Sequence, residues 1–166
     1  MGIKINATDI LNFIKKEPLN QNYTLGVSEF CPYGEGRRLD MFYFNRWNRE
    51  CRGYEIKISR GDFLQDKKWE TYLKFCTYFY FIAPAGIIKV EELPEKIGLI
   101  EIDVRQVDLA KESWRTSEVF EDDGISFEME KRIVRRAKRL HDIDQERYVQ
   151  LLEGLLIKVI YQKNIL

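Results

Sequence analysis

The chain is poor in the residues that several common kinds of protein chemistry require. Among its 166 residues there is one histidine, His141, and there are three cysteines, Cys31, Cys51 and Cys76, with no C-x-x-C pair. A single histidine excludes zinc fingers and histidine-ligated metal nucleases, and it excludes most Ser-His and Cys-His hydrolases. Three widely spaced cysteines are best explained as small core residues in a reducing compartment.

Long apolar runs are also missing. No stretch is apolar enough to suggest a membrane span, and the N-terminus has no signal-peptide pattern. We therefore expect a cytoplasmic protein with no membrane partner. Hydrophobic residues make up 45% of the chain and charged residues 33%, a composition that can bury a core within one domain of this length. The prediction is a single domain over residues 1–166.

Net charge is absent as well, because 27 Lys and Arg residues balance 27 Asp and Glu residues. A compact nucleic-acid-binding protein usually has a basic excess, so the total counts mildly against that function. The charges are unevenly distributed, however. From Arg37 to Lys74 there are ten basic and six acidic residues, whereas acids gather at 118–123. A neutral total can therefore hide a basic face.

Apolar spacing and turn residues predict an α/β fold with a mixed central sheet. Ser59 and Asp62 form an S-x-x-D capping box at the start of a central helix, which is long enough for a right-handed parallel crossover. The expected elements are a helix at 7–16, strands at 25–30, 38–44 and 53–58, a helix from Ser59 that includes Cys76, strands at 78–83 and 98–102, and helices at 128–140 and 145–160.

Three charged side chains are predicted to converge on the second and third strands. Side chains alternate along a strand, so Glu55 and Lys57 share one face while Tyr54 and Ile56 share the other. Asp40 lies on the preceding strand, and an antiparallel hairpin can bring it level with Glu55. Two carboxylates and one ammonium group would then occupy one small volume.

This set of groups suits phosphodiester cleavage. Mg²⁺ prefers a few carboxylate and carbonyl oxygens plus waters, which Asp40, Glu55 and the Ile56 carbonyl could supply. A bound metal acidifies a water and clamps the phosphate, and Lys57 could orient that water or offset transition-state charge. The expected cofactor is Mg²⁺, with Mn²⁺ as a substitute.

The spacing of these residues resembles a known signature. Asp40, followed after fourteen residues by Glu55-Ile56-Lys57, is similar to the D…E-x-K pattern of PD-(D/E)XK nucleases. Residues 25–103 further resemble the MmcB-like DNA-repair branch of that class, through Glu29, Arg37-Arg38-Leu39-Asp40, Tyr54-Glu55-Ile56-Lys57-Ile58-Ser59, Asp62-Phe63, Asp66-Lys67-Lys68-Trp69, Tyr72, Tyr78-Phe79-Tyr80-Phe81 and Gly98-Leu99-Ile100. The resemblance implies a restriction-endonuclease-like core at about 7–103, a DNA substrate and a divalent metal.

Several candidates keep two interpretations. Glu29 could be a further metal ligand or a surface residue at a strand end. Lys67, Lys68 and Trp69 could contact DNA, or they could form a solvated helix face with the tryptophan in the core. Arg37 and Arg38, which flank the predicted metal site, are better candidates for phosphate contacts. The Asp66-Lys67-Lys68 triplet is treated as a chance D-x-K on the central helix.

The C-terminal extension, about 112–166, is predicted to be helical. Its basic residues could form a second nucleic-acid surface, although a solvated face of an amphipathic helix is the simpler explanation. These residues are Lys131, Arg132, Arg135, Arg136, Lys138 and Arg139. Apolar residues of the last helix are assigned to the core or to a homodimer contact; they are Leu151, Leu152, Leu155, Leu156, Val159 and Ile160.

Two functions follow. The first is a metal-dependent, endonuclease-like hydrolase acting on DNA in repair, defence or phage biology. The second is a catalytically silent nuclease fold that binds DNA or recruits a partner in a repair complex. DNA cleavage in the presence of Mg²⁺ separates the two.

Overall fold

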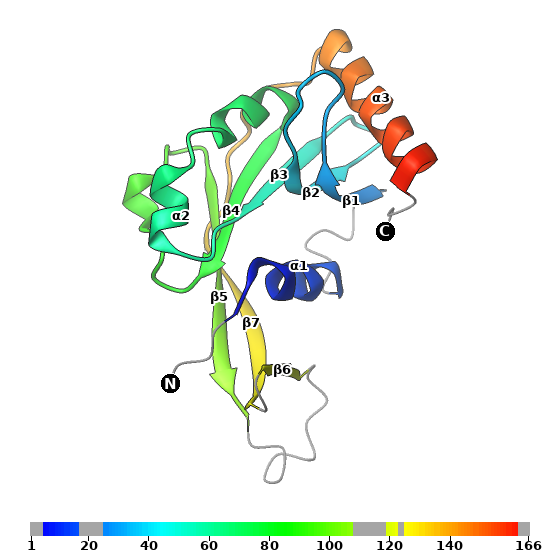
Figure 1. The fold of residues 1–166 in the computed structure, drawn as a ribbon. Helices are drawn as coiled ribbons and strands as arrows, with labels where there is room; N and C mark the ends of the chain where they lie inside the picture. Colours follow the sequence, from blue (N-terminus) through cyan, green and yellow to red (C-terminus); the bar gives the residue numbers. More distant parts are fainter. Residues whose placement is uncertain (1–4, 17–24, 108–118, 123–124, 163–166) are drawn as a thin grey trace.

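A seven-stranded mixed sheet forms the centre of the computed structural model, which describes residues 5–16, 25–107, 119–122 and 125–162. The strand order is β1-β2-β3-β4-β5-β7-β6, with β3–β4 and β4–β5 parallel and the other pairs antiparallel (Figure 1). The strands are β1 Leu25–Phe30, β2 Leu39–Phe44, β3 Cys51–Ile56, β4 Tyr78–Pro84, β5 Gly98–Gln106, β6 Phe120–Asp122 and β7 Ile125–Arg135. The predicted β2–β3 hairpin and the mixed sheet are confirmed.

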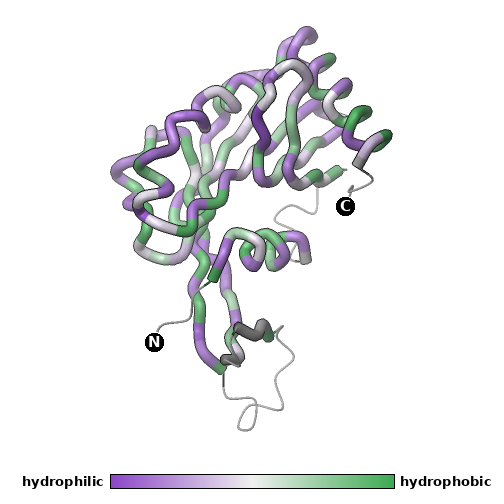
Figure 2. Tube along the Cα trace, viewed as in Figure 1, coloured by the Kyte–Doolittle hydropathy of each residue, from purple (hydrophilic) through white to green (hydrophobic). Residues whose placement is uncertain are grey.

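Apolar side chains cover both faces of the sheet. On one face, Ile10 and Ile14 of α1 (Ala7–Lys16) pack with Tyr54 and Ile56 of β3. The other face packs against η1 (Trp69–Phe75) and α3 (Gln145–Gln162), from which Leu151 and other side chains are fully buried. Figure 2 shows the apolar colouring that runs along the strands between these layers. Alternation along β3 therefore follows the prediction, with Tyr54 and Ile56 on one face.

The crossover between β3 and β4 differs from the single helix that was predicted. It consists of α2 (Arg60–Gln65) and η1, separated by a break at Asp66. Ser59 is the N-cap as predicted, since the Asp62 N–H donates to Ser59 Oγ at 3.1 Å. The second half of the predicted capping box differs, because Asp62 Oδ2 accepts from the Ile58 N–H at 3.3 Å. The helix ends because Asp66 Oδ1 accepts from the Lys68 N–H at 2.7 Å, a side-chain turn that competes with helical hydrogen bonds.

The helix predicted at 128–140 is wrong. Residues 125–135 instead form β7, which pairs with β5 over most of its length, and residues 136–144 are irregular. Phe127 and Met129 are buried against the α1 side of the sheet, two residues apart as a strand requires. The unpaired edge of β5 supplied a strand partner, and this tertiary pairing overrode a helix-like pattern of charges. Together β5 and β7 extend from the body as a ribbon (Figure 1).

The last helix, predicted at 145–160, is confirmed as α3. Its Leu151 and Leu155 are buried, whereas Leu152, Leu156, Val159 and Ile160 are exposed, so the predicted apolar set divides between core and surface. Residues 112–118 of the predicted extension lie outside the described residues. Within the described part of the chain, no helix is both long and apolar enough to span a bilayer. Cys51 and Cys76 are buried free thiols, as expected of core cysteines, whereas Cys31 is a free thiol that is only partly buried.

Candidate active site

The β2–β3 hairpin brings Asp40 beside Glu55. The antiparallel register pairs Met41 with Tyr54, and one further step places Asp40 opposite Glu55. Side chains directly opposite each other in antiparallel strands lie on the same face. The Asp40 Oδ2 atom accepts a hydrogen bond from the Ile56 N–H at 2.6 Å, which fixes the carboxylate against β3 at the point where the strand ladder ends.

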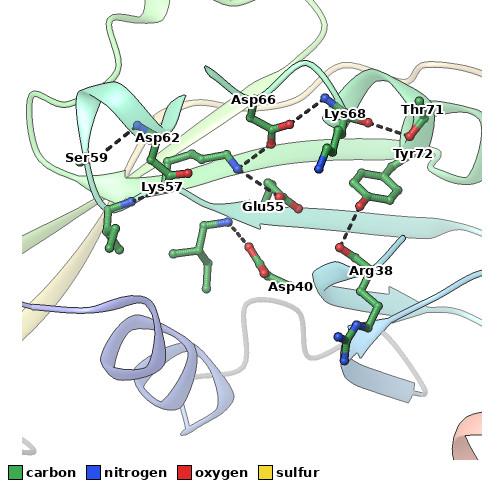
Figure 3. A network of polar contacts seen from close by, with 12 residues as sticks. Arg38, Asp40, Glu55, Lys57, Ser59, Asp62, Asp66, Lys68, Thr71 and Tyr72 are labelled. Carbon is green, nitrogen blue, oxygen red and sulfur yellow. Dashed lines mark hydrogen bonds and ion pairs between the residues drawn. The ribbon is translucent and has the colours of Figure 1, made fainter. Parts of the chain in front are cut away.

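Lys57 lies between two carboxylates (Figure 3). Its Nζ atom is 3.1 Å from Glu55 Oε1 and 2.6 Å from Asp66 Oδ2. The Lys57 backbone N–H donates to the Ile82 carbonyl of β4 at 2.9 Å, so the residue is anchored to the centre of the sheet. The lysine side chain is 6% exposed and that of Glu55 is 11% exposed. The three predicted residues therefore meet at one end of β3.

The pKa of Glu55 is strongly affected by the burial of these charged groups. Burial, and then the charge of Asp40, raise its pKa to about 8. Burial also raises the pKa of Asp40, although the Ile56 N–H opposes that shift. Among the described residues, Glu55 Oε2 is the one buried side-chain oxygen or nitrogen without a hydrogen-bond partner. Such an atom is costly in a folded protein and calls for an explanation.

The Lys57–Asp66 pair is ionised. Burial lowers the pKa of Lys57, but the hydrogen bond that its ammonium donates to Asp66 and the interaction with Glu55 outweigh burial and raise the pKa above its ordinary value. Burial raises the pKa of Asp66, and the hydrogen bonds from Lys57 and the Lys68 N–H more than offset this, so the net shift is downward. Lys57 is thus an ammonium group that stabilises or orients negative charge, not a proton acceptor.

These groups open into a polar cavity of about 510 Å³. Its wall holds the predicted phosphate contacts Arg37 and Arg38, together with Lys68. The Tyr72 hydroxyl donates to the Arg38 carbonyl at 2.9 Å, which ties η1 to the start of β2. Burial, reinforced by the nearby carboxylates, raises the pKa of Tyr72 to about 12. The complete lining is Gly36, Arg37, Arg38, Glu55, Lys57, Asp62, Gln65, Asp66, Lys68 and Tyr72.

The remaining candidates lie elsewhere. Glu29 is exposed and faces a separate cavity of about 50 Å³ beside α3, so the structure does not bring it to Glu55. Lys67 lines a different pocket, on the other side of Asp66. The Trp69 ring packs against the rings of Phe79 and Phe81, with centroids 5.8 and 5.3 Å away. Of the two interpretations of Trp69, this contact favours a place in the core.

Asp66 is the site residue that the sequence interpretation missed. On an unbroken helix its D-x-K triplet had no reason to face Lys57. The helix break turns its carboxylate onto the lysine ammonium. The signal was present in the sequence, because an aspartate three residues before Trp69 can end one helical segment and start the next.

Comparison with known proteins adds a family to this geometry. The model of a family described as DNA repair protein MmcB-like matches residues 16–117, more than half of the chain. The chain belongs to the MmcB-like DNA repair protein family. Its fold resembles that of the SPO1766 protein of unknown function from Silicibacter pomeroyi, with a TM-score of 0.55 and 20% identity, covering 93% of this chain and 88% of the other. No curated protein matches the chain.

The donor set of this MmcB-like site suits a hard cation. Within the described ranges, no three His, Cys, Asp or Glu side chains group together as metal ligands. Mg²⁺ does not require such a cage, since it is commonly bound by one or two carboxylates, waters and substrate phosphates. The partnerless Glu55 Oε2, next to the Asp40 carboxylate, offers the oxygen donors that this mode of binding needs.

The basic run of the MmcB-like chain at 131–139 is largely committed to structure. Arg135 donates to four backbone carbonyls, those of Val90, Leu93, Pro94 and Ile97. Other members form ion pairs: Arg132 with Glu101 and Asp103, Lys138 with Glu95, and Arg139 with Glu50 and Asp142. The segment is therefore not the solvated face of a helix that was predicted, and most of its basic side chains are paired instead of forming a free surface for nucleic acid.

Proposed function

We propose that this protein is a metal-dependent phosphodiester hydrolase with endonuclease-like activity on DNA, built on a restriction-endonuclease-like core of the PD-(D/E)XK type. One observation carries the proposal: Glu55, with a buried oxygen that lacks a partner, lies with Lys57 in the wall of a polar cavity, and the Ile56 N–H holds the Asp40 carboxylate against the same strand. The MmcB-like DNA repair family supports a DNA-related function. The helix, three-strand, crossover, strand order at 7–84 supports the core type.

Each residue has a role in this proposal. The carboxylates of Asp40 and Glu55, with the Ile56 carbonyl, would hold Mg²⁺ or Mn²⁺. When bound, such a cation acidifies a water and offsets charge on the phosphate. Lys57, held as an ammonium, orients the attacking water or stabilises the charge that develops on phosphate oxygens. Cleavage would leave a 5′-phosphate and a 3′-hydroxyl.

DNA recognition is assigned to the basic wall of the cavity. Arg37, Arg38 and Lys68 lie around the opening, where guanidinium and ammonium groups can contact phosphate oxygens on either side of the scissile bond. Guanidinium groups suit this role because they bind phosphate in a bidentate manner. Such contacts position a backbone and do not select a sequence.

A binding protein without turnover is the second candidate. Two observations favour it: the net charge is zero, and the Lys57 ammonium already has the Asp66 carboxylate as an ion-pair partner and a hydrogen bond to Glu55 Oε1. In that case the same cavity would bind DNA, or the protein would recruit a partner in a repair complex. Binding of DNA that is independent of divalent metal, without cleavage of duplex, single-stranded, flap or junction substrates, would support this candidate.

The deciding experiment is a DNA cleavage assay with Mg²⁺ or Mn²⁺. Wild type is compared with Asp40→Ala and Lys57→Ala, which are expected to lose activity by about 10²–10³-fold or more. Lys67→Ala is the matched control, because Lys67 follows Asp66 in the chain yet does not line the cavity. Equal cleavage by wild type, Asp40→Ala and Lys57→Ala contradicts the proposal.

A further inference from the structure

The Lys57 ammonium contacts two carboxylates that differ in what else they do. Glu55 Oε1 is 3.1 Å away, and the other oxygen of Glu55 has no partner. Asp66 Oδ2 is closer, at 2.6 Å, and the other oxygen of Asp66 already accepts from the Lys68 N–H. Glu55 therefore has coordination capacity to spare, whereas both Asp66 oxygens are occupied.

We propose that Asp66 is a positioning residue, which holds the Lys57 ammonium in place for the reaction without binding metal itself. This inference rests on the proposed hydrolase function. Glu55 cannot serve as the sole counter-charge of Lys57, because in that function its carboxylate is shared with a cation. Asp66 remains as a dedicated partner and keeps the lysine directed at the end of β3 (Figure 3).

The break between α2 and η1 makes this role available. The Asp66 N–H still donates to the Asp62 carbonyl at 3.2 Å as the last helical bond of α2. The side chain then folds back, with Oδ1 on the Lys68 N–H and Oδ2 on Lys57. The side chain of Asp66 is 12% exposed, so water competes little for this ion pair. One carboxylate thus ends the helix and places the lysine.

The geometry also limits what Lys57 could do alone. Lysine has a flexible four-carbon stem and a point charge that can satisfy many directions. The 2.6 Å contact with Asp66 and the backbone hydrogen bond to Ile82 restrain the two ends of this residue. A catalytic ammonium must be held within a fraction of an ångström of its working position, and supporting contacts of this kind provide that precision.

The test uses Asp66→Asn in the full chain. The amide keeps an oxygen that can accept from the Lys68 N–H, so the helix break survives, but the negative charge facing Lys57 is lost. We expect kcat for DNA cleavage to fall about 10- to 100-fold, with KM near the wild-type value because DNA contacts are unchanged. Asp66→Glu should recover part of kcat. Glu70→Gln, at an exposed carboxylate of the following helix, is the control and should match wild type.

A second measurement does not depend on turnover. In the metal-free protein at one fixed pH, the ¹H–¹⁵N signal of the Lys57 ammonium should be visible because the ion pair slows proton exchange. We expect this signal to disappear or shift in Asp66→Asn and to persist in Glu70→Gln. Binding of Ca²⁺, followed by calorimetry, should remain within error of wild type in Asp66→Asn and be lost in Asp40→Ala.

The outcomes separate the two proposals. Failure of wild type to cleave DNA with Mg²⁺ or Mn²⁺ overturns the hydrolase function, and the catalytic meaning of Asp66 falls with it. Cleavage by wild type together with unchanged kcat and an unchanged Lys57 signal in Asp66→Asn overturns the inference alone. Loss of Ca²⁺ binding in Asp66→Asn also overturns it, because that result makes Asp66 a ligand. Reduced kcat with intact Ca²⁺ binding supports it.

Discussion

At the residue scale, the buried carboxyl group of Glu55 makes the stability of the metal-free protein depend on pH. Its folded-state pKa is raised to about 8 from an ordinary 4.5, so the folded chain retains a proton that the unfolded chain has released. The stability that this proton confers is complete below about pH 4.5 and is lost as the pH rises towards 8. Without metal, the protein should therefore become less stable across that interval.

Replacing Glu55 by Gln should remove this pH dependence. In EDTA at pH 8, we expect Glu55→Gln to raise the free energy of unfolding by about 1–3 kcal/mol, because the neutral amide avoids the cost of burying a carboxylate charge beside Asp40, while at pH 4.5 the two proteins should be similar. Urea unfolding at several pH values measures this. Glu130→Gln, at an exposed carboxylate of β7, is the control. Equal pH slopes for wild type and Glu55→Gln would contradict the assignment.

At the residue scale, alternation within strands was sufficient to predict most of the site. Glu55 lies on β3 and Lys57 directly follows its last residue, two positions on, and the hairpin register that places Asp40 opposite Glu55 follows from the lengths of β2, β3 and their turn. Asp66 could not be found in this way. Its position depends on a helix break made by its own side chain, and helical periodicity assigns it to a solvated face.

At the element scale, β7 shows why basic residues do not by themselves make a DNA surface. The Arg135 guanidinium donates to the carbonyls of Ile97 at 2.8 Å, Pro94 at 2.8 Å, Val90 at 3.1 Å and Leu93 at 3.3 Å. Val90 is the first residue of η2 (Val90–Glu92), and the other three carbonyls belong to the connection between η2 and β5. Arg135 therefore stabilises a loop whose backbone groups lack strand partners.

We predict that Arg135→Met lowers the free energy of unfolding by about 1–3 kcal/mol because it removes four hydrogen bonds, without weakening DNA binding by the folded protein. The Val90 and Pro94 carbonyls keep the N–H of Leu93 and Ile97, so the loss falls mainly on the Leu93 and Ile97 carbonyls. Arg136→Met, at the exposed neighbouring position, should leave stability within about 0.5 kcal/mol of wild type. Urea unfolding and fluorescence anisotropy with labelled DNA provide the two measurements. Loss of DNA affinity in both variants with unchanged stability would restore a nucleic-acid role for this segment.

The misassigned helix at 128–140 also has a physical explanation at this scale. Ile125, Phe127 and Met129 alternate with polar residues, a period-two signal that favoured a strand, but the charged run that follows fits a helix equally well. The segment forms a strand because it pairs with the edge of β5, and this pairing continues as far as Arg135. Long-range pairing of this kind is absent from local sequence patterns, whereas the hairpin and α3 are encoded locally.

At the scale of the whole molecule, zero net charge and a nucleic-acid function are compatible because the charges are partitioned. The basic residues of 131–139 are mostly used in ion pairs and backbone contacts. Arg37, Arg38 and Lys68 instead line the cavity, where they can meet a phosphate backbone. DNA contact should then be confined to the opening of this cavity. Because few phosphates are contacted, the affinity for DNA should fall only weakly as the salt concentration rises.

The exposed side of α3 defines the remaining surface of interest. Its apolar stripe consists of Val149, Leu152, Leu156, Val159 and Ile160. The first four recur at spacings of three and four residues, and Ile160 lies four residues after Leu156. Leu156 is 58% exposed and Ile160 is 57% exposed. The helix is tied firmly to the body, because the Tyr33 N–H donates to the Gln150 carbonyl at 3.1 Å and Lys158 Nζ donates to the Glu29 carbonyl at 3.3 Å.

The homodimer contact predicted for the last helix stays a prediction, which rests on the fact that apolar residues at three- and four-residue spacing form the seam of paired helices and can be self-complementary across a two-fold axis. Wild type is expected to sediment as a dimer at micromolar concentration and Leu156→Glu as a monomer. Ile133→Glu, at an apolar position of β7 that is 46% exposed, is the control and should remain dimeric. A monomeric wild type, or dissociation of both variants, would refute a dimer formed through α3.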